Sequence, residues 1–433
     1  MSLRQNALLL VLLTAVLAMV GDWGGADHGL AGLWRLPAAF LLLGLAYESW
    51  TVSRSSLSFD LELPERLFLG RSLAVRFVFR HDLRRHLDIE VAPSAPDSFE
   101  LDAEVMPLRV PPGAPAGLAW RASPSRLGEH SWPSMRTRMA GRLGLAWWPK
   151  ELACGRQVRV LPDLFCGENE VKGLAASGAK AGPQGGAGAE VMRLRDYRAG
   201  DPPRVLDWKA TARTGRLISR DFAQDQRLQI VIAVDAGRAS ALRAGSLDRF
   251  GHYVNVAARL AQHAVARDDL VGLVVYADRP LAALAPARGT QAVVRLRAVL
   301  AAARVERTES NPLFAAARVR ALVRHRSIIV MLTDVDDATA ASQLVQAVGL
   351  LSPKHLTFVA GLSSAAVEAM SQAPATHWLD PYRALAAQEY RIGLERKVRA
   401  LNALGAPALV ARPEQLERAV FAAYENLRRG RRA

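Results

Sequence analysis

Apolar and polar residues alternate strictly once the chain passes Leu57. Every second residue is apolar from Leu57 to Leu63, and the same period returns over residues 73–79, 87–91 and 99–105. A period of two is that of a strand with one buried face. Clusters of Pro, Gly and Ser separate these segments, as turns do. Several short alternating strands without helical spacing predict an antiparallel β-sandwich over residues 52–162.

Beyond Arg227 the apolar runs become continuous and alternate with helical segments. The runs cover residues 230–234, 270–276, 327–333, 356–362 and 408–411. Such runs are typical of strands that are buried on both faces. Between them apolar residues recur at helical spacing, as in Tyr253, Val256, Ala257 and Leu260. The pattern predicts a doubly wound α/β domain over residues 228–433, with a mostly parallel sheet covered by helices on both faces.

Two apolar runs set the first fifty residues apart, one from Ala7 to Val20 and one from Leu36 to Tyr47. Each run is shorter than the ~20 residues that a spanning helix needs. Tryptophans that can lie at membrane interfaces flank the runs, however, at Trp23, Trp34 and Trp50. We interpret residues 1–50 as a transmembrane helical hairpin. A cleaved signal peptide is the alternative, since Arg4 precedes a run of suitable length.

Basic residues orient this predicted hairpin. Arg4 and Arg54 flank its outer ends, whereas the connecting loop carries Asp22 and Asp27 with only Arg35. Basic residues favour the cytoplasmic side of a membrane. We therefore expect both ends of the hairpin, and all soluble domains after it, to be cytoplasmic.

The composition indicates a folded protein with a basic surface. The chain has 433 residues, half of them hydrophobic, and a formal net charge of +15. This length suits two or three domains. The charge favours an anionic neighbour, such as phospholipid, an acidic protein or nucleic acid, unless the arginines are paired or solvated. The two cysteines, Cys154 and Cys166, exclude a disulfide framework.

Two further segments are distinctive in composition. Residues 173–189 are rich in Gly and Ala and predict a flexible linker; no Gly-Lys-Ser/Thr follows them, which argues against a phosphate-binding loop. The basic run Arg428–Arg432 lacks interleaved aromatic residues, so it is weak evidence for nucleic-acid binding. We expect no nucleic-acid partner, and near a membrane such a run can bind anionic lipid.

Two aspartates at strand ends are the candidate cation ligands. Ligands of an open parallel sheet bind beyond the carboxyl ends of its strands, and Asp235 and Asp334 each follow an apolar run. Thr333, Asp336 and residues 308–311 could supply further oxygens for a weak, water-rich Mg²⁺ site. The alternative is that the carboxylate of Asp235 caps the turn that follows it.

A charged passage ahead of the α/β domain resembles the signature of a bacterial family, the domain of unknown function fifty-eight. The matching residues are Glu190, Arg195, Tyr197, Gly200, Asp201, Arg204, Asp207, Trp208, Lys209, Ala212 and Arg213. We name residues 190–227 the signature segment. The resemblance covers nearly the whole chain, because the family also has an N-terminal membrane hairpin and a β-rich segment.

The resemblance also implies a von Willebrand factor A-like domain over residues 228–433. Such domains bind a metal ion through Asp-x-Ser-x-Ser, a distant threonine and a second aspartate. Asp235 and Asp334 match the two aspartates, but Gly237 and Ala239 stand at the serine positions. The metal-ion-dependent adhesion site is therefore degenerate, and metal-dependent ligand capture is in doubt.

The resemblance implies a protein that binds a partner rather than one that catalyses a reaction. Members are typically encoded beside a MoxR-type AAA+ ATPase and are thought to act as its membrane-anchored adaptors. We therefore expect a non-enzymatic adaptor or co-chaperone of the bacterial inner membrane, serving envelope maturation or stress response, with the ATPase, other envelope proteins and membrane lipid as partners.

The expected partner-binding residues lie in the signature segment and are Arg195, Tyr197, Asp201, Arg204, Asp207, Trp208, Lys209 and Arg213. The alternative is that these charges form an internal ion-pair network. A Mg²⁺-dependent hydrolase that uses Asp235 and Asp334 is the second candidate function. It has little support, because the chain lacks Gly-x-Ser-x-Gly, His-Glu-x-x-His and a Walker lysine.

Overall fold

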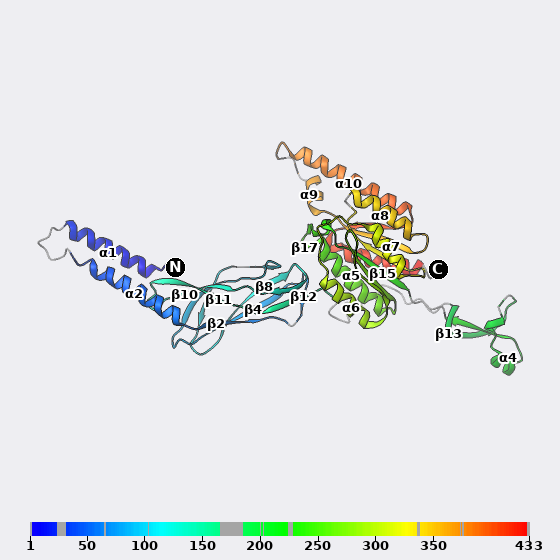
Figure 1. Cartoon of the computed structure of the whole chain (residues 1–433), viewed down its shortest axis with the longest axis horizontal. Coiled ribbons are helices and arrows are strands. Elements are labelled where there is room, and N and C mark those ends of the chain that lie inside the picture. Colours follow the sequence, from blue (N-terminus) through cyan, green and yellow to red (C-terminus); the bar gives the residue numbers. More distant parts are fainter. Residues whose placement is uncertain are drawn as a thin grey trace. The chain divides into compact units, whose positions relative to one another are not determined.

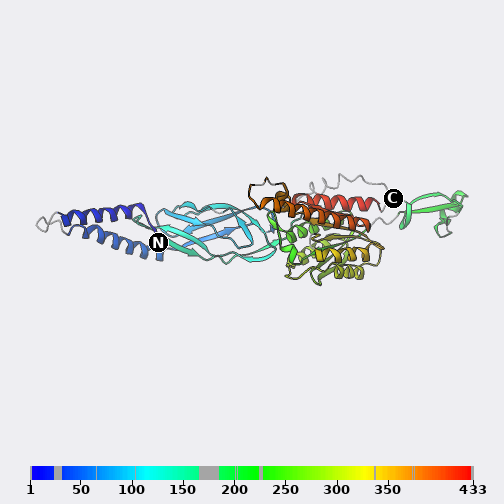
Figure 2. The same ribbon diagram turned by 90° about the horizontal axis from the view of Figure 1, so that it is seen from above.

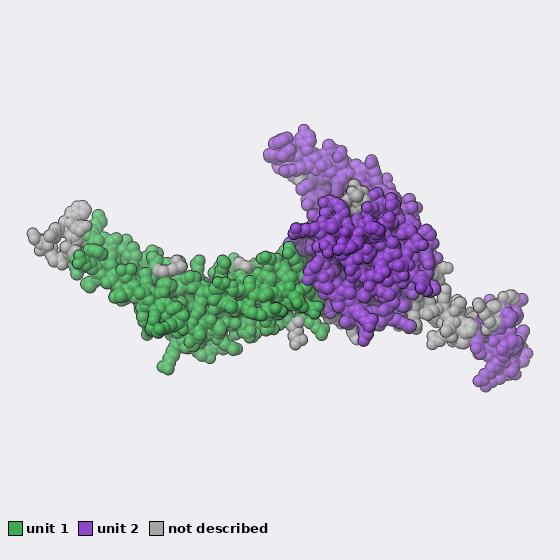
Figure 3. All heavy atoms as spheres, in the orientation of Figure 1, with its two compact units in different colours: residues 1–162 green, residues 163–433 purple. Residues whose placement is uncertain are grey.

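The computed structural model divides the chain into two compact units, residues 1–162 and residues 163–433 (Figure 3). We refer to them as unit 1 and unit 2 and describe each by itself. The structure describes residues 2–23, 32–64, 66–102, 104–164, 185–199, 201, 203–223, 228–335, 338–372, 374 and 376–430.

Unit 1 begins with two helices that lie side by side, α1 (Gln5–Trp23) and α2 (Arg35–Arg54) (Figures 1 and 2). No helix in the described part of the chain combines the length and the apolar character that a membrane crossing requires. The predicted transmembrane hairpin, and with it the predicted inner-membrane location, is therefore wrong.

The physical reason lies in the length and the polarity of the two helices. The apolar run of α1 rises only about 21 Å, against the roughly 30 Å of a bilayer core. The second half of α2 carries Tyr, Glu, Ser and Thr, and its residues Gly44, Glu48 and Val52 are buried. Apolar side chains of both helices, among them Leu12 and Leu43, are exposed. The flanking tryptophans do not make up for the missing apolar length.

The described residues of unit 1 also form three sheets. Their strands are β1 (Ser2–Leu3), β2 (Leu57–Glu62), β3 (Leu67–Phe68), β4 (Leu73–His81), β5 (Leu87–Ala92), β6 (Phe99–Leu101), β7 (Met106–Val110), β8 (Ala116–Pro124), β9 (Gly128–Ser131), β10 (Met135–Ala140), β11 (Ala146–Leu152) and β12 (Gln157–Leu161). The sheet orders are β1-β11-β10-β5-β7, β2-β4-β8-β6 and β3-β12-β9. All of these pairs are antiparallel except β3 with β12.

The alternation of apolar and polar residues in the sequence corresponds to alternating burial of side chains along the strands. The residues of β5 are buried and half-buried in turn, as expected for a strand with one face on a core. That core is aromatic: the rings of Phe77 and Trp120 lie 5.1 Å apart, and those of Phe99 and Trp132 lie 5.4 Å apart. The strand expected over residues 99–105 is shorter than predicted, since β6 ends at Leu101 and the next strand, β7, begins only at Met106.

The signature segment in unit 2 folds as a β-hairpin with a helical insertion. Strands β13 (Gly185–Asp196) and β14 (Ile218–Ala223) pair antiparallel. Between them lie η2 (Pro203–Val205) and the short helix α4 (Trp208–Thr214). The predicted linker ends earlier than expected, because β13 already begins at Gly185; residues 173–184 lie outside the described residues.

The rest of unit 2 is built on a six-stranded sheet in the order β19-β18-β15-β20-β21-β22. Its strands are β15 (Gln229–Asp235), β18 (Leu270–Tyr276), β19 (Pro280–Ala287), β20 (Ile328–Leu332), β21 (Leu356–Leu362) and β22 (Ala408–Ala411). Neighbouring strands are parallel except β19, which pairs antiparallel with β18. The five continuous apolar runs thus form the five parallel strands, and the sequence analysis missed β19.

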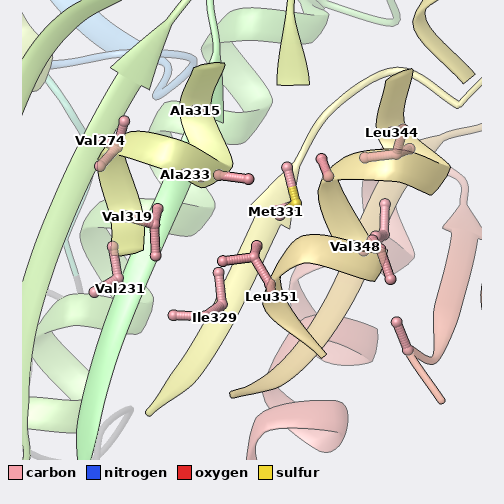
Figure 4. Packing of buried hydrophobic residues seen from close by; sticks show 14 of the residues in the cluster. Val231, Ala233, Val274, Ala315, Val319, Ile329, Met331, Leu344, Val348 and Leu351 are labelled. Atoms are coloured by element: carbon pink, nitrogen blue, oxygen red, sulfur yellow. The ribbon is translucent and has the colours of Figure 1, made fainter. Parts of the chain in front are cut away.

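Helices cover both faces of this sheet. They are η3 (Arg238–Ala241), α5 (Arg249–Ala266), α6 (Gly289–Ala302), α7 (Pro312–Leu322), α8 (Ala338–Leu351), α9 (Ala365–Gln372), α10 (Asp380–Ala403) and α11 (Pro413–Gly430); a small ribbon of β16 (Arg243–Ala244) and β17 (Leu247–Asp248) precedes α5. On one face, Val231 and Met331 pack against α7 and α8 (Figure 4). Helices α5 and α11 contact the strands from the other face.

Candidate functional site

The parallel pairing of β15 with β20 brings the two predicted aspartates to one edge of the sheet. Val234 is opposite Leu332, so Asp235, at the end of β15, and Thr333, just after β20, become neighbours. Asp334 follows. All three residues are buried, with exposed fractions of 4% or less. Their side chains must therefore find partners inside the protein.

Hydrogen-bond donors occupy both carboxylate oxygens of Asp235. The Gly237 N–H donates to Oδ1 at 2.8 Å, and the Ser310 hydroxyl donates to the same oxygen. The Thr333 hydroxyl donates to Oδ2 at 2.6 Å. The Ser240 hydroxyl donates to the Asp235 carbonyl oxygen at 3.0 Å. The alternative reading, that Asp235 caps the following turn, is confirmed.

Ser310 occupies the space of the absent serine side chain. A Cβ atom added to Gly237 would collide with the Ser310 hydroxyl oxygen. The loop that carries Ser310 is held close, because the Arg238 N–H donates to the Thr308 carbonyl at 2.9 Å. A hydroxyl thus still reaches Asp235, but from a distant loop. The sequence pattern indicates this loop only as a source of oxygens.

An arginine side chain neutralises Asp334. Arg249, the first residue of α5, donates through Nη1 to Asp334 Oδ2, and both side chains are nearly fully buried. Tyr253 lies one helical turn further along α5. Burial, and then the negative charge of Asp334, raises the pKa of Tyr253 well above its usual value. Sequence reasoning missed Arg249; its one local signal is the capping Asp248 that starts α5 beside it.

These residues do not fit a divalent cation. Magnesium needs several oxygen ligands with free lone pairs, whereas Asp235 accepts three hydrogen bonds and Asp334 pairs with a guanidinium. No cluster of three or more His, Cys, Asp or Glu residues that could hold a metal ion occurs among the described residues. Asp336 lies outside them. We derive no reaction step through a metal here.

Within the signature segment, Asp201 is the centre of a charged network. Arg195 donates to it twice, at 2.7 and 2.9 Å, and the Arg198 N–H donates at 3.0 Å. Ser219 adds a hydroxyl at 3.2 Å, and Tyr197 donates to the Asp201 carbonyl at 3.3 Å. The Arg195 guanidinium, followed by the Arg198 amide, holds the pKa of Asp201 well below its usual range.

Asp207 anchors the helix α4. One of its carboxylate oxygens accepts from the Ala210 N–H at 2.9 Å, which caps the helix, and the other accepts from Arg220 on β14 at 3.0 Å. The Arg220 guanidinium lowers the pKa of Asp207. The helix stops at Gly215, whose φ of 67° is left-handed and suits glycine. Both ends of α4 are thus fixed.

The predicted partner-binding residues therefore separate into two sets. Arg195, Tyr197, Asp201 and Asp207 form internal contacts, as the alternative of an ion-pair network expects. The other set is exposed on α4 and consists of Trp208, Lys209 and Arg213, with Trp208 66% exposed. Arg204 lies in η2, and its side chain is outside the described residues.

Part of the basic C-terminal run has a structural role. Arg428 is buried on α11 and donates to Asp269 at 3.0 Å. Tyr424 also donates to this carboxylate. The Arg428 guanidinium is thus committed to an internal ion pair; residues 431–433 lie outside the described residues.

Comparison with solved structures gives weak likenesses. A conserved hypothetical protein, BatB from Bacteroides thetaiotaomicron, is 17% identical, with a TM-score of 0.25, and the match covers 31% of this chain and 66% of that protein. A fragment of α2-macroglobulin from Escherichia coli is 14% identical, with a TM-score of 0.21, and the match covers 26% of this chain and 17% of that one. At these scores neither likeness carries an argument.

The family comparison matches the signature segment and most of the sheet that follows it. A search of curated proteins finds no match to this chain. Residues 193–362 match the model of the family described as "Protein of unknown function DUF58", a stretch that runs from β13 to the end of β21. This part of the chain is therefore similar to that family.

Proposed function

We propose that this chain is a non-enzymatic adaptor that binds a MoxR-type AAA+ ATPase through the exposed face of α4. The sheet of unit 2 would be a von Willebrand factor A-like domain that carries this face. The single observation behind the proposal is the exposed set Trp208, Lys209 and Arg213 on a helix that is fixed at both ends.

The composition of this face suits protein recognition. Tryptophan and arginine dominate the residues that contribute most to protein interfaces. An exposed tryptophan on a helix fixed by Asp207 loses little conformational freedom on binding. Lys209 and Arg213 add positive charge, which would complement an acidic surface on the ATPase.

The site at the sheet edge favours this proposal over the Mg²⁺-dependent hydrolase. Activation of water by a metal ion needs open ligand positions. The two carboxylates that would provide them, Asp235 and Asp334, are engaged by hydroxyl, amide and guanidinium donors. We therefore assign them a structural role in supporting the end of the sheet.

Binding of the purified chain to a MoxR-type AAA+ ATPase from the same organism tests the proposal. We expect Trp208→Ala to weaken the complex about 30-fold, which corresponds to roughly 2 kcal/mol for a central aromatic residue. Lys209→Glu combined with Arg213→Glu should weaken it further at low salt. Biolayer interferometry at two salt concentrations measures both effects.

Matched controls come from α6, which also exposes an apolar and a basic residue. Val294 is 66% exposed and Arg295 lies beside it on the surface. Val294→Ala and Arg295→Glu should leave the affinity unchanged. Equal losses from both pairs of variants, or no binding of the unaltered chain, would refute the proposed role of α4.

A further inference from the structure

A pocket of about 320 Å³ lies in unit 1 between α2 and two strand connections. One connection joins β4 to β5 and carries Arg84 and Arg85, and the other joins β10 to β11 and carries Arg142. The volume is in the range of small-molecule sites. Three arginines around one pocket make it strongly positive.

None of these arginines has a described carboxylate as its partner. Arg84 and Arg85 form no ion pair with any described residue, and Arg142 donates to the neutral Tyr47 hydroxyl at 2.8 Å. The acidic residues beside them are already engaged. Asp82 accepts from the Ser56 N–H at 3.2 Å, and Asp88 accepts from Arg109 at 2.8 Å. The three guanidinium groups thus have no carboxylate partner among the described residues and can bind an anion.

Both connections are held in place by hydrogen bonds. In the first, the Leu83 N–H donates to His81 Nδ1 at 3.1 Å, and His81 Nε2 lies 3.0 Å from the Val110 carbonyl. In the second, the buried Glu48 carboxylate accepts from the Leu143 N–H at 2.7 Å, from the Leu145 N–H, and from the N–H of Ala146, the first residue of β11. The arginines are thus presented by fixed backbone, which lowers the entropic cost of binding.

The other part of the pocket is apolar. Val52, Leu83, Leu87 and Met139 line it beside the arginines. Leu87 and Met139 are fully buried and Val52 nearly so, whereas Leu83 is half-buried at the pocket. Inorganic phosphate would leave Leu83 partly in contact with water, whereas an apolar substituent on the phosphate would cover it. Arginine binds phosphate oxygens through paired N–H donors. The two halves of the pocket therefore match the two halves of one amphiphilic molecule.

We propose that this pocket binds a phosphate-bearing amphiphile. The phosphate lies among Arg84, Arg85 and Arg142, and the apolar chain lies against Leu83. This assignment is independent of the proposed role of α4, because the pocket belongs to unit 1 alone.

Calorimetric titration of the full chain tests this site with two probes. The first probe is monomeric dihexanoyl phosphatidic acid, below its micelle concentration, and the second is inorganic phosphate. We expect the phosphatidic acid to bind at least tenfold more tightly. The double variant Arg84→Gln/Arg85→Gln should weaken its binding at least tenfold, because two charge-assisted contacts are lost.

The exposed Arg121 on β8 provides the matched control, and Arg121→Gln should change the affinity less than twofold. Unchanged circular dichroism spectra show that the variants are folded. Inorganic phosphate that binds as tightly as the phosphatidic acid would overturn the assignment of an amphiphile. Binding that is absent, or that both Arg84→Gln/Arg85→Gln and Arg121→Gln leave unchanged, would overturn the site itself.

Discussion

Arg249 and Ser310 are partners of the two buried carboxylates at the end of the sheet. Neither residue belongs to the Asp-x-Ser-x-Ser pattern. Arg249 neutralises Asp334 from the first residue of α5, and the Ser310 hydroxyl takes the space beside Gly237. A side-chain cation and a hydroxyl from another loop thus satisfy the two carboxylates. Because the partners are built into the chain, we expect this edge to be stable without added metal.

Removing only the guanidinium group of Arg249 tests how far the buried Asp334 carboxylate depends on it. We expect Arg249→Met to lower the free energy of unfolding by about 3–5 kcal/mol, because it leaves a buried charge without compensation. The double variant Arg249→Met/Asp334→Asn should cost clearly less than the sum of the two single variants. Urea unfolding of all three measures this coupling. Strictly additive losses would contradict a direct buried pair.

Glu48 joins the helix α2 to the connection between β10 and β11. Its carboxylate accepts from the backbone amides of Leu143, Leu145 and Ala146 and from the Trp148 indole at 3.2 Å. A Cβ atom on Gly141 would collide with this carboxylate. The contact ties the second half of α2 to the sheet that contains β10 and β11, and it positions Arg142 at the pocket beside α2.

We expect Glu48→Gln to destabilise unit 1 by roughly 3 kcal/mol, since an amide cannot satisfy these donors and adds N–H groups that face them. Hydrogen exchange at the amides of Leu143, Leu145 and Ala146 should become faster. Glu62→Gln is the control, because Glu62 is exposed and 3.7 Å from Arg76. Slow exchange retained in Glu48→Gln would argue against this role of the carboxylate.

Each of the two units has a core of its own. The core of unit 2 is made by β15, β18, β20 and β21 with the helices α7 and α8. Aromatic rings such as Phe77 and Trp120 form the core of unit 1. Since neither core borrows a strand from the other unit, the two should be separable.

We expect residues 163–433, expressed alone, to fold. The fragment should show mixed helix and strand signals by circular dichroism and one cooperative thermal transition for the sheet domain. The matched fragment of residues 1–162 tests the other unit in the same way. A fragment 163–433 that unfolds without cooperativity would show that its sheet needs unit 1.

Local patterns predicted much of unit 2 but overestimated the first helices. The continuous apolar runs identified β15, β18, β20, β21 and β22 because burial on both faces removes polar residues from such strands. The edge strand β19 carries prolines and a weaker pattern, and it was missed. Apolar runs flanked by tryptophans suggested a membrane hairpin, although Glu48 of α2 accepts hydrogen bonds from Ala146 and Trp148 on β11, which is distant in sequence.

The sequence by itself determined the periodic elements and the family signature, since both depend on residues that are close together along the chain. Tertiary structure alone decided which charges are free and which are paired. Asp334 meets Arg249 across 85 positions, and Asp235 meets Ser310 across 75. No local pattern encodes such pairs, because they arise only when the sheet has formed and parallel strands bring their carboxyl ends to one edge.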